Sequence, residues 1–147
     1  MKLQKNTLLA LYSIIEFAGR PGEHVSAGEV AAKHGESAHH LAKVLSELVR
    51  AGFVESVRGV GGGYRFVGNP RRLTMLDVIQ LFEPVAGERH AAANAVDHVL
   101  GQVLDEIDQT AVATFGSITV STLLQMVQRA AAPTAHFNVH NTQHDVY

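Results

Sequence analysis

The 147-residue sequence contains no cysteine and no tryptophan. The absence of cysteine excludes disulfides, thiol nucleophiles and every metal or iron–sulfur site that depends on thiolate ligands. No apolar run approaches the roughly 18 residues of a membrane span, and no basic segment followed by an apolar one opens the chain. We therefore expect a soluble, cytoplasmic protein without a membrane partner. Hydrophobic residues make up 46% of the chain, which is sufficient for a folded core.

Positive charge is scarce in the second half of the chain. Residues 1–72 contain ten Lys and Arg and six Asp and Glu, whereas residues 73–147 contain two Arg and eight acids, which together give the net charge of −2. The basic excess of the first half is typical of a surface that faces a polyanion. The alternative is that the charged residues of a near-neutral protein are unevenly distributed by chance.

Hydrophobic spacing predicts three helices in the first third of the chain. A broad apolar face predicts a helix over 6–18, and Ser26 begins a short helix that ends near Lys33. Ser37 precedes a third helix, whose apolar side chains recur at i, i+3, i+4 and i+7, and Gly52 follows it.

A glycine-rich loop between two β-type segments predicts a hairpin. The segments cover 53–58 and 64–67, and Gly59-Val60-Gly61-Gly62-Gly63 connects them. The order of three helices and a hairpin is that of a winged helix-turn-helix, so the predicted fold class is mainly α with a small β-hairpin wing.

Three further helices are predicted after the hairpin. Thr74 and Asp77 have the spacing of a capping box and begin a helix that includes Phe82 and stops at Pro84. The next helix carries the longest amphipathic stripe of the chain, which consists of Val96, Val99, Leu100, Val103, Leu104 and Ile107. The last helix covers 119–131, with four side chains expected to face inward: Val120, Leu123, Leu124 and Val127.

The chemistry of the first half suits a DNA-binding role. In a winged helix-turn-helix the recognition helix enters the major groove and the wing lies along the backbone or minor groove. We expect His39, His40 and Lys43 to be exposed near the N-terminus of that helix, where donors and the helix dipole meet phosphates and base edges. Arg58 and Arg65 flank the wing loop. An amphipathic helix and hairpin without a DNA-binding role would show the same pattern.

The segment from Leu48 to Tyr64 resembles the signature of the Rrf2 family of bacterial transcription regulators, L-x-x-x-G-[LF]-[VI]-x-S-x-R-G-x-G-G-G-[YF]. Four other segments also resemble family motifs, namely 8–18, 37–41, 73–79 and 118–123. The resemblance covers about residues 2–128. It implies a homodimeric regulator, with repression as the expected mode, that binds a pseudo-palindromic operator in double-stranded DNA. The sequence itself offers no Ser/His/Asp arrangement, no phosphate-binding loop between a strand and a helix and no carboxylate pair in a credible pocket, so we do not expect an enzyme.

The resemblance also implies a division of the chain and a set of DNA-contacting residues. We expect a winged helix-turn-helix domain over 1–84, a dimerisation helix and final helix over 85–131, and a flexible tail over 132–147. The 96–107 stripe matches the family's dimer helix, with packing inside the same chain as the alternative. The expected DNA-binding residues are Ser37, His39, His40, Lys43, Arg50, Arg58, Gly61, Gly62 and Tyr64.

Many members of this family hold an iron–sulfur cluster through three cysteines between the fourth helix and the dimer helix. This chain has no cysteine, and residues 85–95 are too few for the family's C-x5-C-x5-C spacing. We therefore expect no cofactor. His90 and His98 are the candidates for a metal or haem site, and His136, His140 and His144 form a second group. The alternative for these histidines is that they are ordinary polar surface residues. The alternatives for the function are a metal- or haem-responsive regulator and a module that binds a regulatory protein or small ligand.

Overall fold

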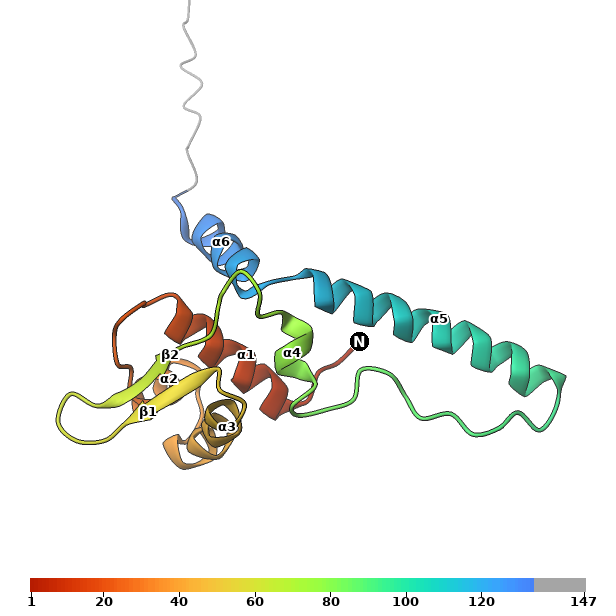
Figure 1. The fold of residues 1–147 in the computed structure, drawn as a ribbon, viewed down its shortest axis with the longest axis horizontal. Coiled ribbons are helices and arrows are strands. Elements are labelled where there is room, and N and C mark those ends of the chain that lie inside the picture. The colour runs from red at the N-terminus through yellow and green to blue at the C-terminus, as the bar shows by residue number, and fades with distance from the viewer. Residues whose placement is uncertain (134–147) are drawn as a thin grey trace, which may run out of the picture.

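The computed structural model describes residues 1–133, and its elements follow the order expected from the sequence (Figure 1). The predicted fold class is confirmed: within the described part, helices predominate and one antiparallel hairpin is present. The elements are α1 (Lys5–Ala18), α2 (Ala27–Lys33), α3 (Ala38–Arg50), β1 (Val54–Val57), β2 (Gly63–Phe66), α4 (Met75–Ile79), α5 (Ala95–Ser117) and α6 (Val120–Ala131). Among the described helices, none combines the length and apolar character that a membrane crossing requires.

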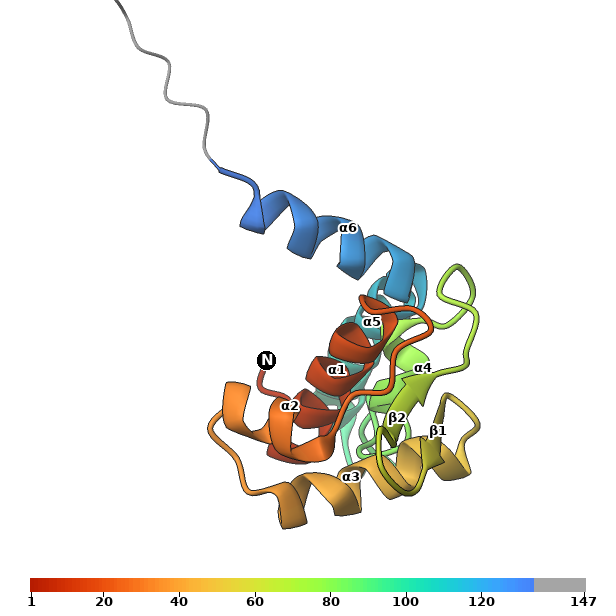
Figure 2. The same ribbon diagram turned by 90° about the vertical axis from the view of Figure 1, so that its left-hand side faces the viewer.

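The apolar core lies between α1, α3 and α4. The predicted α3 stripe is buried, with Leu41, Leu45 and Leu48 fully enclosed. It packs against α1, whose Ile14 and Phe17 are also buried, in one cluster with side chains from α2, β1 and α4. This packing fixes α2 and α3 against α1, so the exposed face of α3 is held in one orientation (Figure 2).

Local capping sets the ends of α2 and α3. The Ser26 hydroxyl accepts a hydrogen bond from the Glu29 backbone N–H, and the Ser37 hydroxyl accepts one from His40 N–H at 3.1 Å. Gly52 follows α3 with a φ of +79°, a left-handed conformation that ends the helix without steric cost. The chain then turns directly into the hairpin.

The hairpin is joined to the helices by backbone bonds. In its register Val54 lies opposite Phe66 and Val57 lies opposite Gly63. Beyond the hairpin itself, Tyr64 exchanges two backbone hydrogen bonds with Val25, at 2.8 and 2.9 Å. The wing is therefore fastened to the segment just before α2.

The helix α4 begins as predicted but ends earlier. Thr74 and Asp77 form both bonds of the capping box. The prediction that the helix includes Phe82 was wrong, because α4 ends at Ile79. The Phe82 N–H donates to Ile79 three residues before it, which tightens the chain into a turn ahead of Pro84.

The helix α5 is the longest described element and projects away from the other helices (Figure 1). It begins after the N-cap Asn94 and continues to Ser117, well beyond the stripe. The loop over 85–94 runs outward beside α5 to the N-terminal end of that helix, and its Arg89 forms ion pairs with Asp105 and Asp108 (Figure 1).

The helix α6 returns to the first helices and packs along α1. Its Val120 is 1% exposed and belongs to the core, and Leu123 and Leu124 are half-buried. The prediction that Val127 faces inward was wrong, because this side chain is 48% exposed. The helix diverges from α1 along its length, so only its first turns are covered (Figure 2). The tail predicted over 132–147 lies outside the described residues from position 134 onward, and this part includes His136, His140 and His144.

Candidate nucleic-acid interface

The exposed face of α3 presents three cationic or ionisable side chains. His39, Lys43 and Arg50 are exposed, as the sequence predicts for a recognition helix. Arg50 contacts Glu47 at 3.0 Å, three residues earlier in the same helix. Within residues 1–133, no acid lies within ion-pair distance of Lys43. Its charge is therefore available to a phosphate.

His40 is less exposed than predicted. The sequence places it beside His39 on the free face, but its side chain is half-buried. The reason is a contact with α1, since His40 Nε2 lies 3.0 Å from the side-chain oxygen of Asn6. Ser37, another predicted contact, uses its hydroxyl to cap α3.

A partly exposed ion pair lies next to this contact. The Lys5 ammonium lies 2.6 Å from the carboxylate of Glu36, in the turn between α2 and α3. The Lys5 hydrogen bond, followed by the backbone N–H of Ser37, lowers the pKa of Glu36 below its ordinary value of 4.5. The turn thus keeps its negative charge beside the basic end of α1, which holds α1 and the helix-turn-helix together.

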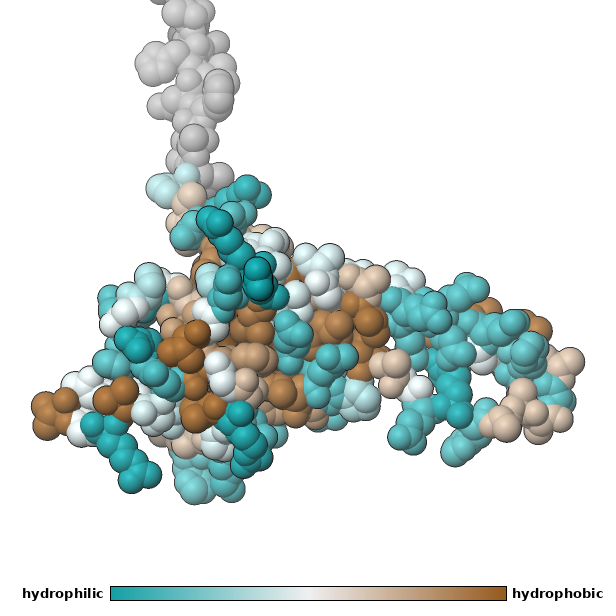
Figure 3. All heavy atoms as spheres, viewed as in Figure 1, coloured by the Kyte–Doolittle hydropathy of each residue, from teal (hydrophilic) through white to brown (hydrophobic). Residues whose placement is uncertain are grey.

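The wing carries one cation without a partner and one with a partner. Arg58 is exposed at the end of β1, and the described part of the chain places no acid within ion-pair distance of it. Arg65 instead faces Glu55 across the hairpin and pairs with its carboxylate. Between them, Val60 is completely exposed at the wing tip, where Figure 3 shows an isolated apolar patch.

The glycines of the wing serve its own backbone. A Cβ on Gly62 would lie 2.3 Å from the carbonyl oxygen of Val57, and one on Gly63 would lie 2.6 Å from that of Val25. Gly61 has a φ of +75° and open space around it, as does Gly59 with a φ of +105°, so both glycines leave the wing surface accessible. The Tyr64 ring stacks on Phe17 with centroids 5.9 Å apart, which supports the wing from the core side.

The stripe on α5 is uncovered. Its six residues are between 47% and 67% exposed, namely Val96, Val99, Leu100, Val103, Leu104 and Ile107. The loop over 85–94 contacts the helix at Asp105 and Asp108, and these two residues lie on a different side of α5 from the stripe. Among the described residues, therefore, no part of the same chain covers the stripe, in contrast to the alternative that it packs within its own chain. A continuous exposed apolar face of this kind marks an interaction surface.

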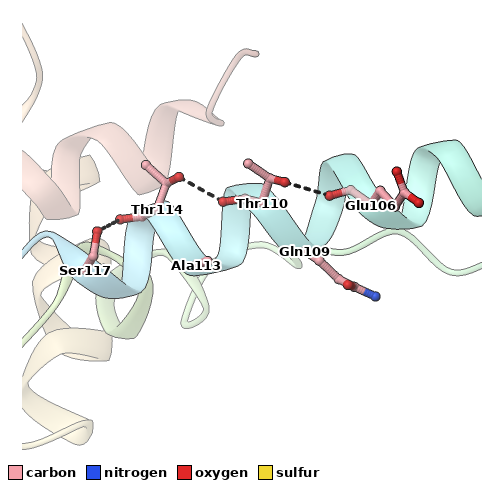
Figure 4. Close-up of a pocket in the computed structure, with 6 residues that line it drawn as sticks. All are labelled: Glu106, Gln109, Thr110, Ala113, Thr114 and Ser117. Atoms are coloured by element: carbon pink, nitrogen blue, oxygen red, sulfur yellow. Dashed lines mark hydrogen bonds between the residues drawn. The ribbon is translucent and has the colours of Figure 1, made fainter.

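The candidate metal ligands do not gather. His90 and His98 are both exposed, and within residues 1–133 no three His, Cys, Asp or Glu side chains are grouped for metal binding. A hollow near the C-terminal end of α5 also offers little to a ligand (Figure 4). Its hydroxyls on Thr110, Thr114 and Ser117 donate to carbonyls of their own helix.

Sequence reasoning missed Asn6, Glu83 and Val60. Asn6 and Glu83 have partners far away in the chain, which periodicity does not detect. A signal for Val60 was present, because an apolar side chain between two glycines of a wing loop has no neighbour to cover it.

Comparison with known proteins agrees with this arrangement. The model of the Rrf2 family, described as an iron-dependent transcriptional regulator, matches residues 3–126. The chain is 48% identical to BadM of Rhodopseudomonas palustris, which is named as an HTH-type transcriptional regulator. The match extends over 131 residues and covers 86% of this chain and 83% of BadM.

Two solved structures are similar to the whole fold. CymR, called the global cysteine regulator of B. subtilis, superposes with a TM-score of 0.77 at 25% identity, over 86% of this chain and 98% of CymR. IscR of T. potens superposes with a TM-score of 0.71, also at 25% identity, over 90% of this chain and 93% of IscR.

Proposed function

The chain belongs to the Rrf2 family of transcriptional regulators, and we propose that it is a homodimer that binds a pseudo-palindromic operator and represses transcription. The observation that supports this most directly is that Lys43 on the recognition helix and Arg58 on the wing are both exposed and have no acidic partner among residues 1–133. These two cations lie on the two elements that a winged helix-turn-helix applies to DNA. The first enters the major groove, and the second reaches the backbone or minor groove.

Dimerisation supplies the second half of the DNA-binding surface. We assign the 96–107 stripe of α5 to the contact with a second copy, since its apolar side chains are uncovered and lie on one side of the helix. A two-fold interface is self-complementary, so one apolar stripe can bury another. Two recognition helices about one DNA turn apart would then contact the two halves of a pseudo-palindrome.

The DNA-contacting residues in this proposal are unequal in role. His39, Lys43, Arg50 and Arg58 supply exposed donors, and Gly61 leaves the wing backbone accessible. Ser37, Gly62 and Tyr64 contribute through structure, by capping α3 and by shaping and supporting the wing. His40 is held against α1 by its contact with Asn6.

The residues do not fit the iron named in the family's description. Without cysteine the chain has no thiolate ligand, and the histidine of the 85–94 loop has no two further ligands near it in the described part. Iron therefore has no part in the proposed mechanism. The loop is instead fastened to α5 by Arg89.

The test is selection of genomic fragments with the purified protein, followed by titration of the recovered duplex at several salt concentrations. We expect affinity to fall steeply with salt, and Arg58→Ala to cost about 1–3 kcal/mol of binding and to reduce the salt slope by about one. Arg129→Ala, which removes an exposed arginine from α6, is the matched control and should bind like the parent protein.

Two results would contradict the proposal. The first is a failure to enrich any fragment at low salt, above all if another protein co-purifies in stoichiometric amount, which would favour a partner-binding module. The second is an equal effect of Arg58→Ala and Arg129→Ala, which would show that the wing contributes only net charge.

A further inference from the structure

The first turn of α1 connects two distant parts of the chain. The backbone N–H of Gln4 and the hydroxyl of Thr7 both donate to one oxygen of Glu83, which follows α4. Between them, Lys5 pairs with Glu36 and Asn6 contacts His40, both at the start of the recognition helix. Four successive residues thus hold partners in two other segments.

The contact between Asn6 and His40 has a defined chemical consequence. The Asn6 side-chain oxygen only accepts hydrogen bonds, so its 3.0 Å contact with His40 is a hydrogen bond in the tautomer that carries the proton on Nε2. In a neutral imidazole the other nitrogen, Nδ1, is then an acceptor. Asn6 therefore selects the tautomer of His40 as well as the direction of its ring.

The backbone around His40 is fixed in the same way. Its N–H donates to the Ser37 cap, and the preceding turn is held by the ion pair between Lys5 and Glu36. On the other side, Glu83 prevents the first turn of α1 from fraying by accepting from Gln4 and Thr7. Asn6 is thus presented by a turn that is itself anchored.

We propose that Asn6 is a positioning residue for DNA recognition, which acts by holding the His40 ring in one orientation and one tautomer at the front of the recognition helix. This proposal rests on the proposed DNA-binding function. A side chain that is already ordered loses less conformational freedom when it enters an interface, so the bond in the free protein favours complex formation. Because the bond to Asn6 leaves Nδ1 of His40 as an acceptor, it also favours a hydrogen-bond donor on the DNA as the partner of His40, such as the exocyclic amino group of adenine or cytosine.

The test is a double-mutant cycle measured on the duplex recovered with the parent protein. Asn6→Leu removes the acceptor at similar size. We expect it to weaken binding about threefold for each subunit, and so about tenfold for a dimer with two copies. In a His40→Ala background, Asn6→Leu should have no further effect, because its route to DNA is already lost.

Two measurements separate this role from general destabilisation. Imidazole nitrogen resonances should report the Nε2–H tautomer of His40 in the parent protein and a mixture in Asn6→Leu, with the melting temperature nearly unchanged. Gln125→Leu, which removes an exposed amide from α6, is the matched control and should leave both the resonances and the affinity unchanged.

The outcomes distinguish the two proposals. If the parent protein binds no duplex specifically, the DNA-binding function fails and this role fails with it. If the parent protein binds but Asn6→Leu binds equally well, or weakens binding by the same factor with and without His40, only the positioning role is overturned.

Discussion

Replacing Ile107 by aspartate tests the assignment of the α5 stripe to a dimer interface. Ile107 is 57% exposed in the single chain. Full burial of an isoleucine side chain is worth about 1.5–3 kcal/mol, so covering its exposed part contributes about 1–1.5 kcal/mol. A two-fold dimer contains the residue twice, which gives about 2–3 kcal/mol. The desolvated carboxylates add to this cost, so we expect a dimer about a hundredfold weaker.

Sedimentation equilibrium over a dilution series measures this change directly. Gln102→Asp is the matched control because it adds the same charge to the same helix, about 140° around its axis from Ile107. It should dimerise like the parent protein. If Ile107→Asp remains folded and dimerises with unchanged affinity, the stripe is not the interface. Operator binding should follow the same order, with Ile107→Asp requiring a higher protein concentration than Gln102→Asp.

Three other predictions concern the wing, the turn before α3 and the loop. Gly63→Ala should lower the free energy of unfolding in urea by about 1–3 kcal/mol, because its φ is +152° and its Cβ would lie 2.6 Å from the carbonyl oxygen of Val25. Glu36→Gln should be less stable than the parent protein at neutral pH. The lowered pKa of Glu36 means that its carboxylate stabilises the fold above pH 4.5, and this advantage should vanish in a pH series of thermal melts as the pH falls through that lowered pKa. Arg89→Ala should raise amide hydrogen exchange in residues 85–94 while leaving exchange in α1 unchanged.

The sequence predicted the features that depend on neighbouring residues. The caps at Ser26, Ser37 and Thr74 are local pairs three residues apart, and each is present. The buried stripe of α3 follows from a single helical period. These features suffice to identify the three helices and the hairpin, because the whole motif is built from short-range patterns.

Features that depend on distant contacts were predicted less well. His40 is half-buried because Asn6 lies against it, and Val127 is exposed because α6 leaves α1 before reaching it. Arg65 and Arg58 look equivalent in the sequence, yet only Arg65 has a cross-strand acid opposite it. Hairpin register decides that difference, and register becomes certain only when both strands are placed.

The missing cysteines change how the loop before α5 must work. A cluster would join this loop to the rest of the protein through metal bonds, whereas here the guanidinium of Arg89 reaches Asp105 and Asp108, and the Gly87 N–H donates to Asp108 at 3.0 Å. The loop leads back through Pro84 to Glu83, whose carboxylate holds the first turn of α1, and that turn holds His40. The contacts of Arg89 end on α5 and those of Glu83 end on α1, so displacing Arg89 frees the loop from α5 alone. Partly exposed ion pairs contribute little to stability, so such displacement requires little free energy. Loop opening in Arg89→Ala should consequently stay local, and the ring resonances of His40 should match those of the parent protein because Glu83 still holds the first turn of α1.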